Sequence, residues 1–167
     1  MYRVIKALNH NAVLVLDGAS QEYLIMGKGI GFGKKVSERI EPAPDSVVYS
    51  LQSVSERGKA KDLFKEIDPR YLEMADAVLN EAAKEFAHVD RGVLFPMADH
   101  IAFAVSRMRR GEVIANLLTQ DIQVLFYKEF KAASLVRRLL MEEEGLEVPD
   151  DEIGYVALHV HAATAGE

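Results

Sequence analysis

The hydrophobic pattern of this chain changes its period once, near residue 53, and that change constrains the fold more than any other feature. Residues 2–51 hold short alternating apolar runs, several rich in β-branched side chains, which are typical of strands. From Ser53 onward, apolar residues recur at spacings of three and four, the period of an amphipathic helix. We therefore predict an α+β chain in which a small antiparallel β module precedes an all-α helical bundle.

Four strands are predicted in the β module, around residues 4–5, 12–16, 22–26 and 46–52. The Asn9-His10-Asn11 and Asp17-Gly18 segments read as tight connections, because Asn and Gly tolerate positive φ. Residues 27–35 form a glycine-rich turn. A sheet of only about 50 residues is marginal alone, so we expect a dimer that buries one of its faces.

Several helices are predicted in the second half. Asp68-Pro69 is a helix start, with Asp as the cap and Pro in the first turn. Further helices are expected over residues 98–108 and 122–141, and a last one opens at Pro149 with acidic residues in its first turn. The expected organisation is a β module over residues 1–55, a linker over 56–66 and a helical domain over 67–167.

The charge of the chain is unevenly distributed. The first 52 residues carry six basic and five acidic side chains, whereas the remaining 115 carry 14 basic and 21 acidic ones. An acidic chain is unsuited to binding nucleic acid over its whole surface, but a locally basic module can do so, because phosphate contacts act within about 10 Å. The first third is therefore the candidate for a nucleic-acid interface.

Some classes of protein are disfavoured by what the sequence lacks. It contains no cysteine, which excludes disulfides, thiolate metal sites and cysteine nucleophiles. The apolar residues at the N-terminus are interrupted too often for a secretory signal, and no stretch approaches the ~20 apolar residues of a membrane span. We expect a cytoplasmic protein without membrane insertion.

The segment at residues 26–35, MGKGIGFGKK, is the most informative stretch of the β module. Glycine at every second position permits positive φ and a close approach of other backbone. The lysines can meet phosphates, and a ring at Phe32 could stack on unpaired RNA bases. Neither G-x-G-x-x-G nor the Walker pattern fits the spacing. The alternative is a strained turn with solvated lysines and Phe32 in the core.

Five histidines are the candidate reactive groups: His10, His88, His100, His159 and His161. His159 and His161 point to different sides of a helix, which does not suit a shared metal ion. The sequence pairs no histidine with a serine or an arranged carboxylate, so we expect no catalytic residues, no metal and no cofactor. Phosphoryl acceptance remains open, because neutral imidazole is nucleophilic and a phosphate adds close to two negative charges. The alternative is a hydrogen-bonded or surface histidine.

Together these motifs resemble a known family. Lys6, Asn9-His10-Asn11 and the segment MGKGIGFGKK are similar to the co-antiterminator RNA-binding domain of the BglG/LicT antiterminators. The helical half resembles the first phosphotransferase-system (PTS) regulation domain of that family, through Asp99-His100-Ile101 and through the run GYVALH at residues 154–159. The resemblance covers almost the whole chain, with both motif sets in the right order.

The resemblance implies a function that is not enzymatic. The β module would dimerise and bind an RNA hairpin in a nascent leader transcript, which excludes an overlapping terminator hairpin. The regulation domain would also dimerise. When sugar is absent, a sugar-specific PTS permease (enzyme II) would phosphorylate this domain, and the phosphorylation would disable RNA binding. By match to the family motifs, the phosphorylated residues would be His100 and His159, and the RNA contacts would be Lys6, Asn9, Asn11, Gly27, Lys28, Gly29 and Phe32.

The sequence departs from the family pattern at two points. The second loop residue is often Arg in the family and is Lys28 here, which keeps the charge but loses the planar fork. The family usually has a second regulation domain, and this sequence ends at Glu167, which leads us to expect either a fragment or a short member.

Two other functions stay open from the sequence. One is a phosphoryl-accepting regulator whose β module only dimerises. The other is a DNA-binding repressor, for which Arg107, Arg109 and Arg110 are the nearest candidate for a basic recognition helix. We interpret this arginine group instead as a solvated helix end or as partners of a phosphate.

Overall fold

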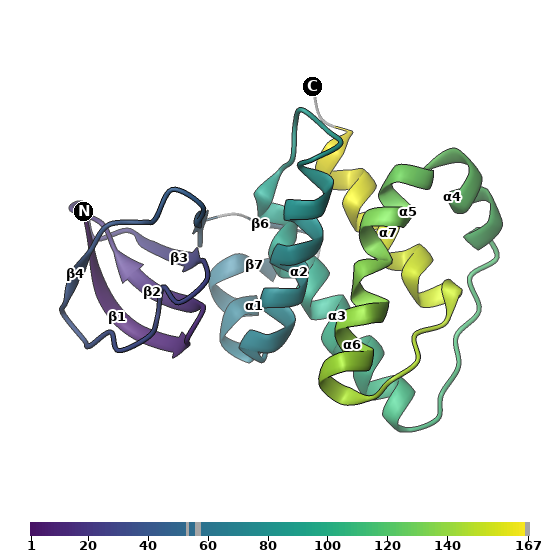
Figure 1. The fold of residues 1–167 in the computed structure, drawn as a ribbon, viewed down its shortest axis with the longest axis horizontal. Helices are drawn as coiled ribbons and strands as arrows, with labels where there is room; N and C mark the ends of the chain where they lie inside the picture. The colour runs from purple at the N-terminus through teal and green to yellow at the C-terminus, as the bar shows by residue number, and fades with distance from the viewer. Residues whose placement is uncertain (53, 56–57, 166–167) are drawn as a thin grey trace. The chain divides into compact units, whose positions relative to one another are not determined.

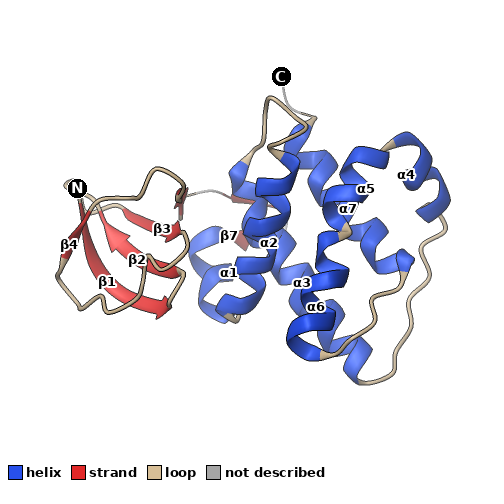
Figure 2. Ribbon diagram, viewed as in Figure 1, coloured by secondary structure: helices blue, strands red, loops and turns tan. Residues whose placement is uncertain are grey.

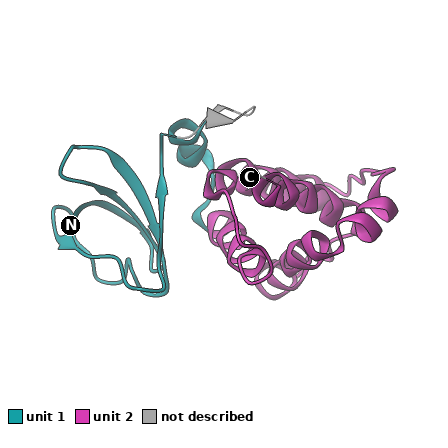
Figure 3. Cartoon of the chain, turned by 90° about the horizontal axis from the view of Figure 1, so that it is seen from above, with its two compact units in different colours: residues 1–69 teal, residues 70–167 magenta. Residues whose placement is uncertain are grey.

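A computed structural model describes residues 1–52, 54–55 and 58–165 and divides the chain into two compact units, Met1–Pro69 and Arg70–Glu167 (Figure 3). Strands lie in the first unit and the second is helical, which confirms the predicted α+β class (Figure 2). Part of the predicted linker, at residues 56 and 57, lies outside the described residues, as does the end of the predicted helical domain at 166–167.

Unit 1 contains an antiparallel sheet of five strands in the order β4-β1-β2-β3-β5 (Figure 1). Their bounds are β1 Tyr2–Asn9, β2 Ala12–Leu16, β3 Glu22–Met26, β4 Arg39–Ile40 and β5 Val47–Ser50. The four predicted strands are present as β1, β2, β3 and β5, but the predicted count was wrong. Strand β4 pairs only with Tyr2 and Arg3, and two residues are too few to leave an alternating pattern.

The rest of unit 1 follows the sheet. A two-stranded ribbon joins β6 Val54–Ser55 to β7 Gly58–Lys59, and the short helix α1 Ala60–Glu66 comes directly after it. The predicted linker therefore carries regular structure in its described part. Lys61 of α1 forms an ion pair with Glu22 of β3, with 3.0 Å between the charged atoms, which ties this helix to the sheet.

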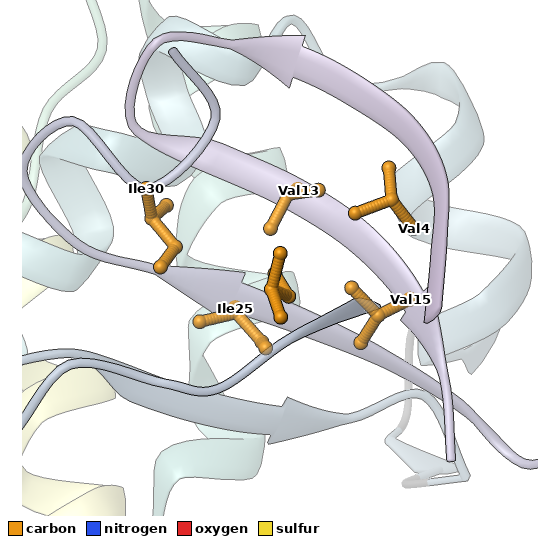
Figure 4. Close-up of a cluster of buried hydrophobic side chains, with 6 residues drawn as sticks. Val4, Val13, Val15, Ile25 and Ile30 are labelled. Carbon is orange, nitrogen blue, oxygen red and sulfur yellow. The ribbon is translucent and has the colours of Figure 1, made fainter. Parts of the chain in front are cut away.

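One face of the sheet is buried within the chain by a cluster of aliphatic side chains (Figure 4). Val13 and Val15 of β2 and Ile25 of β3 point to this face because alternate residues of a strand share a side. The strand β1, the glycine-rich segment and β4 complete the cluster with Val4, Ile30 and Ile40. Ile30 thereby anchors the glycine-rich segment to the core.

Strand β1 does not keep a regular register with β2. Val4 lies opposite Val15 and Lys6 opposite Leu14, with an irregularity between them and a second one between Ala7 and Asn9. Such bulges re-aim side chains that simple alternation would place on one face. Val4 is consequently in the core, whereas Lys6 is exposed.

Unit 2 is a bundle of helices with these bounds: α2 Pro69–Ala82, the 3-10 helix η1 Arg91–Val93, α3 Leu94–Arg109, α4 Thr119–Leu125, α5 Tyr127–Ala133, α6 Leu135–Glu144 and α7 Asp150–Thr164. Helix α7 packs against α3, α4 and α5 and is the centre of the bundle (Figure 1). No helix in the described part of the chain is long and apolar enough to cross a membrane.

Most predicted helices are confirmed, and one is corrected. Helices begin at Pro69 and after Pro149 as predicted, and α3 contains residues 98–108. The single helix predicted over 122–141 is wrong, because α4, α5 and α6 divide that stretch. At the first break, Phe126 leaves the helical region, with φ −122° and ψ 49°. At the second, the Phe130 carbonyl accepts hydrogen bonds from both the Ser134 hydroxyl, at 2.7 Å, and the Ser134 N–H, at 2.9 Å, a side-chain bond that often bends helices.

Candidate functional site

The glycine-rich segment folds against the tight turn between β1 and β2. The Gly31 backbone N–H donates to the His10 carbonyl at 2.8 Å. A Cβ at Gly31 would lie 2.2 Å from the Asn9 carbonyl oxygen, so this contact requires glycine. Gly29 has φ +73°, in the left-handed region. Glycine at these positions thus brings two loops into direct contact.

The two predicted asparagines build this junction. Asn9 Oδ1 accepts the Asn11 backbone N–H at 2.9 Å, a local bond that stabilises the turn. Asn11 Oδ1 accepts the Gly29 N–H at 2.9 Å, and the Asn11 carbonyl accepts the Gly27 N–H at 3.0 Å. The side chain of Asn11 therefore holds the glycine-rich segment in place, in addition to any contact with a ligand.

Phe32 lies at the outer surface of this junction. Its side chain is 66% exposed, which decides against the alternative that it is a core residue. His10 contacts it edge-on, with ring centroids 5.0 Å apart and an interplanar angle of 82°. The sequence interpretation did not include His10 among the contacts, although its place between two turn asparagines was the available signal.

Six of the seven predicted RNA contacts lie in these two bonded loops. They are Asn9, Asn11, Gly27, Lys28, Gly29 and Phe32. Lys6 lies apart in sequence on β1, where the bulge exposes it. Lys28 is also exposed, while Lys34 forms an ion pair with Glu38 at 3.7 Å. The glycine-rich segment thus carries both an exposed ring, at Phe32, and an exposed cationic side chain, at Lys28, a combination that can stack a base and meet a phosphate.

A second candidate site lies between α3 and α7, and the structure brings both predicted histidines together there. The rings of His100 on α3 and His159 on α7 have centroids 5.5 Å apart, and Tyr155 lies 5.8 Å from His100. Spacings of three and seven place Glu152, Tyr155 and His159 on one side of α7. The spacing of seven likewise puts His100 and Arg107 on one side of α3.

Glu152 is the charged centre of this site, and its role was missed from the sequence. Its carboxylate accepts two hydrogen bonds from Arg107 Nη2, at 2.9 and 3.0 Å, and its Oε1 lies 3.7 Å from His100 Nε2. Burial raises the pKa of this carboxyl, but the polar contacts with His100 and Arg107 outweigh burial and hold the pKa below its usual value. The spacing of Glu152 from His159 along α7 was the signal that could have identified it.

The remaining histidines and arginines have other surroundings. His161 pairs through Nδ1 with the buried Glu129 at 3.1 Å and stacks on Phe126, and His88 is exposed. Arg109 forms an ion pair with Glu144, and Arg110 with Glu112. Of the three arginines considered from the sequence, Arg107 is the one that contacts the histidine site. Among the residues that the structure describes, no group of three or more His, Asp or Glu side chains is arranged to hold a metal ion.

Comparison with family models covers both units. Residues 2–57 match the model described as CAT RNA binding domain, and residues 72–163 match the model described as PRD domain. The two candidate sites fall one in each match.

Several curated proteins are similar to this chain over nearly its whole length. A beta-glucoside operon antiterminator of Dickeya chrysanthemi is 28% identical over 95% of this chain and 56% of its own length. Transcription antiterminator LicT of Bacillus subtilis (strain 168) is 26% identical over 99% of this chain and 60% of its own length. Protein GlcT of Staphylococcus aureus (strain JH9) is 31% identical over 98% of this chain and 58% of its own length.

The similarity extends to a solved structure. A crystal structure of GlcT CAT-PRDI is 29% identical and covers 99% of both chains, with a TM-score of 0.79. The present chain therefore matches that two-domain structure over nearly its full length, whereas it spans between 56% and 60% of the curated relatives.

Proposed function

Because this chain belongs to the PRD-domain family, here with a CAT RNA binding domain before the PRD domain, we propose that it is a sugar-responsive transcriptional antiterminator. Its β module binds an RNA hairpin in a nascent leader transcript and thereby prevents formation of the terminator. Its helical domain makes that binding depend on phosphorylation by the PTS. Both domains act in a homodimer.

The exposed Phe32 ring on the glycine-shaped junction is the observation that carries the RNA-binding role. Phe32 stacks on an unpaired base, Lys6 and Lys28 meet phosphates, and Asn9 and Asn11 contact base or sugar edges. The backbone at Gly27 and Gly29 approaches the RNA closely. The basic excess of the first 52 residues supports this assignment, since the remainder of the chain is acidic.

The test is binding of a short RNA hairpin with internal loops, from the leader of a neighbouring sugar operon, across a salt series. We expect affinity to fall with salt and to drop by about 1–3 kcal/mol in Phe32→Ala, the range for loss of one stacked base. Val36→Ala is the matched control, because Val36 is 72% exposed and outside the proposed contacts. Equal affinity of both variants would remove Phe32 from the interface.

The paired rings of His100 and His159 support the regulatory role. We propose that a sugar-specific permease of the PTS transfers its phosphoryl group to these residues. An unprotonated ring nitrogen donates its lone pair to phosphorus, and the bond between phosphorus and the donor side chain breaks with its electron pair leaving on the donor. The added negative charge enters a site that already holds the buried Glu152 carboxylate, and it disturbs the packing of α3 on α7.

Phosphorylation is tested by mass spectrometry of the chain after incubation with the phosphorylated permease domain. We expect phosphoryl transfer to the wild type, less in each single variant His100→Ala and His159→Ala, and none in the double variant. His88→Ala is the control, because His88 is exposed and outside the cluster. Transfer that survives in the double variant would contradict the assignment.

A second candidate function is a phosphoryl-accepting regulator whose β module only dimerises. It is favoured by the histidine cluster alone and predicts phosphoryl transfer without RNA affinity. Repeating the RNA measurement with residues 1–69, which form one compact unit, separates the two candidates. Binding by this unit supports the antiterminator, whereas its failure to bind the leader hairpin supports the second candidate. A duplex DNA competitor in the same assay tests the repressor alternative.

A further inference from the structure

The two ring nitrogens of His100 differ in their surroundings. His100 Nε2 is buried without a hydrogen-bond partner and lies 3.7 Å from Glu152 Oε1. The His100 side chain is nevertheless 16% exposed, so its accessible part lies elsewhere on the side chain. A phosphoryl donor that approaches from outside therefore does not meet Nε2.

The Glu152 carboxylate beside Nε2 is held in place by Arg107. The side chain of Glu152 is only 3% exposed, and both of its carboxylate oxygens accept hydrogen bonds from Arg107 Nη2. This arrangement keeps an oriented anion next to Nε2. A carboxylate beside one nitrogen of a neutral imidazole favours the tautomer that carries its proton on that nitrogen, which leaves the lone pair on the other.

We propose that Glu152, held by Arg107, is a positioning residue that keeps the proton of neutral His100 on Nε2 and directs phosphoryl acceptance to Nδ1. This inference rests on the proposed phosphorylation of His100. The Nδ1 lone pair forms the new bond to phosphorus, and the proton stays on Nε2, where Glu152 stabilises the positive charge that develops on the ring. Glu152 itself does not touch the phosphoryl group.

A second histidine–glutamate pair in the same domain offers an internal comparison. His161 faces Glu129 through Nδ1, at 3.1 Å, rather than through Nε2. The same electrostatic argument therefore predicts the opposite tautomer for His161, with its proton on Nδ1. The two histidines can be compared in a single spectrum.

The first test is the tautomer of each histidine in the full chain, read from long-range proton–nitrogen NMR spectra of protein labelled with ¹⁵N-histidine at about pH 8, above the usual pKa of imidazole. We expect His100 protonated on Nε2 and His161 on Nδ1. In Glu152→Gln, we expect the ratio of the Nε2-protonated to the Nδ1-protonated tautomer of His100 to fall severalfold. The tautomer of His161 should stay unchanged. Asp150→Asn is the control, since it removes an exposed carboxylate from the same turn of α7.

The second test identifies the phosphorylated atom. The full chain is treated with phosphoramidate, a small phosphoryl donor, and then denatured in alkali, where ³¹P NMR separates the two isomers of phosphohistidine. The signal of His100 is the one lost in His100→Ala. We expect the Nδ1 isomer in the wild type and in Asp150→Asn, and a mixture in Glu152→Gln.

The outcomes separate this inference from the proposed function. A His100 signal at Nε2 overturns the role of Glu152 while leaving phosphoryl acceptance intact. A tautomer ratio that is the same in the wild type and in Glu152→Gln also overturns it, even if the variant is less stable. If neither phosphoramidate nor the phosphorylated permease domain gives a phosphoryl signal at His100, the result counts against the proposed function. The tautomer ratio alone then decides the role of Glu152.

Discussion

The two candidate sites of this chain are built by different parts of the polypeptide. In unit 1, backbone groups and glycines shape the surface around Phe32, and the junction depends on hydrogen bonds from Gly29 and Gly31. In unit 2, two helices present side chains at regular spacings, and the site depends on the imidazole of His100 and the carboxylate of Glu152. The first site depends on glycine backbone held by hydrogen bonds, including those accepted by the asparagine side chains, whereas the second depends on the charges of its side chains.

This difference determines which substitutions each site tolerates. A loop held by backbone contacts fails when atoms are added to it, because no rearrangement of a side chain makes room for them. A site between rigid helices fails when a charge is removed, because its partner remains buried without compensation. The following experiments test this contrast.

The largest effect is expected from adding one methyl group at Gly31. Gly31→Ala places a Cβ against the Asn9 carbonyl oxygen, so we expect a loss of about 3 kcal/mol in the free energy of unfolding, the upper range for overpacking. Urea denaturation measures it. Gly18→Ala is the control, because a Cβ there meets no atom within 4 Å. A variant as stable as this control would show that the junction adapts more easily than the contrast requires.

A somewhat smaller effect is expected from truncating Arg107. Arg107→Ala leaves the buried Glu152 without its hydrogen-bond donor, and we expect a loss of about 2 kcal/mol, below the full range for a buried pair because Arg107 stays 22% exposed. Arg138→Ala breaks the exposed pair with Glu142 and should cost less than about 1 kcal/mol. If urea denaturation gives the same loss in the free energy of unfolding for both variants, the ion pair at the histidine site stabilises the fold no more than an exposed pair does.

Substitutions of Asn11 separate shape from charge within the loop proposed to bind RNA. Asn11→Ala loses the hydrogen bond to the Gly29 N–H and should cost about 1 kcal/mol of stability together with RNA affinity. Asn11→Asp retains an acceptor oxygen, so stability should hold while RNA affinity falls through repulsion of phosphates. The pair is measured by urea denaturation and by hairpin binding. Tight RNA binding by Asn11→Asp would contradict a phosphate-lined interface at this loop.

The smallest expected effect is the change in the free energy of unfolding with pH, because a single carboxyl group, that of Glu152, is responsible for it. The pKa of Glu152 is lower in the folded chain than its unfolded value of about 4.5, so its contribution to stability is complete above that value and is lost as pH falls through the folded pKa. We expect the stability difference between the wild type and Glu152→Gln to shrink below about pH 4.5. Urea midpoints across this pH range measure it. A difference that grows on acidification would reverse the assigned direction of the shift.

The same contrast explains what the sequence could predict. Helix spacing and β alternation are local, so the class of each half, β1, β2, β3 and the start of α2 followed from the pattern. The two-residue β4 and the break at Phe126 depend on tertiary contacts and left no periodic trace. The loop and histidine residues were proposed by family resemblance. His10, Glu152 and the distinct role of Arg107 emerged only when their partners were placed in space.

The bulged strand β1 has a consequence for the solubility of the chain. Strand β4 pairs with β1 at Tyr2 and Arg3, and the backbone at Ser37 and Glu38 extends this cover to Val4, so the bulged part of β1 beyond Val4 is not covered by β4. An exposed sheet edge is a template on which other chains can add strands and aggregate. The two irregularities of β1 twist its backbone away from a flat edge, and Lys6 adds a charge there. We therefore expect Lys6, the residue proposed to meet RNA phosphate, also to disfavour edge-to-edge growth of the sheet.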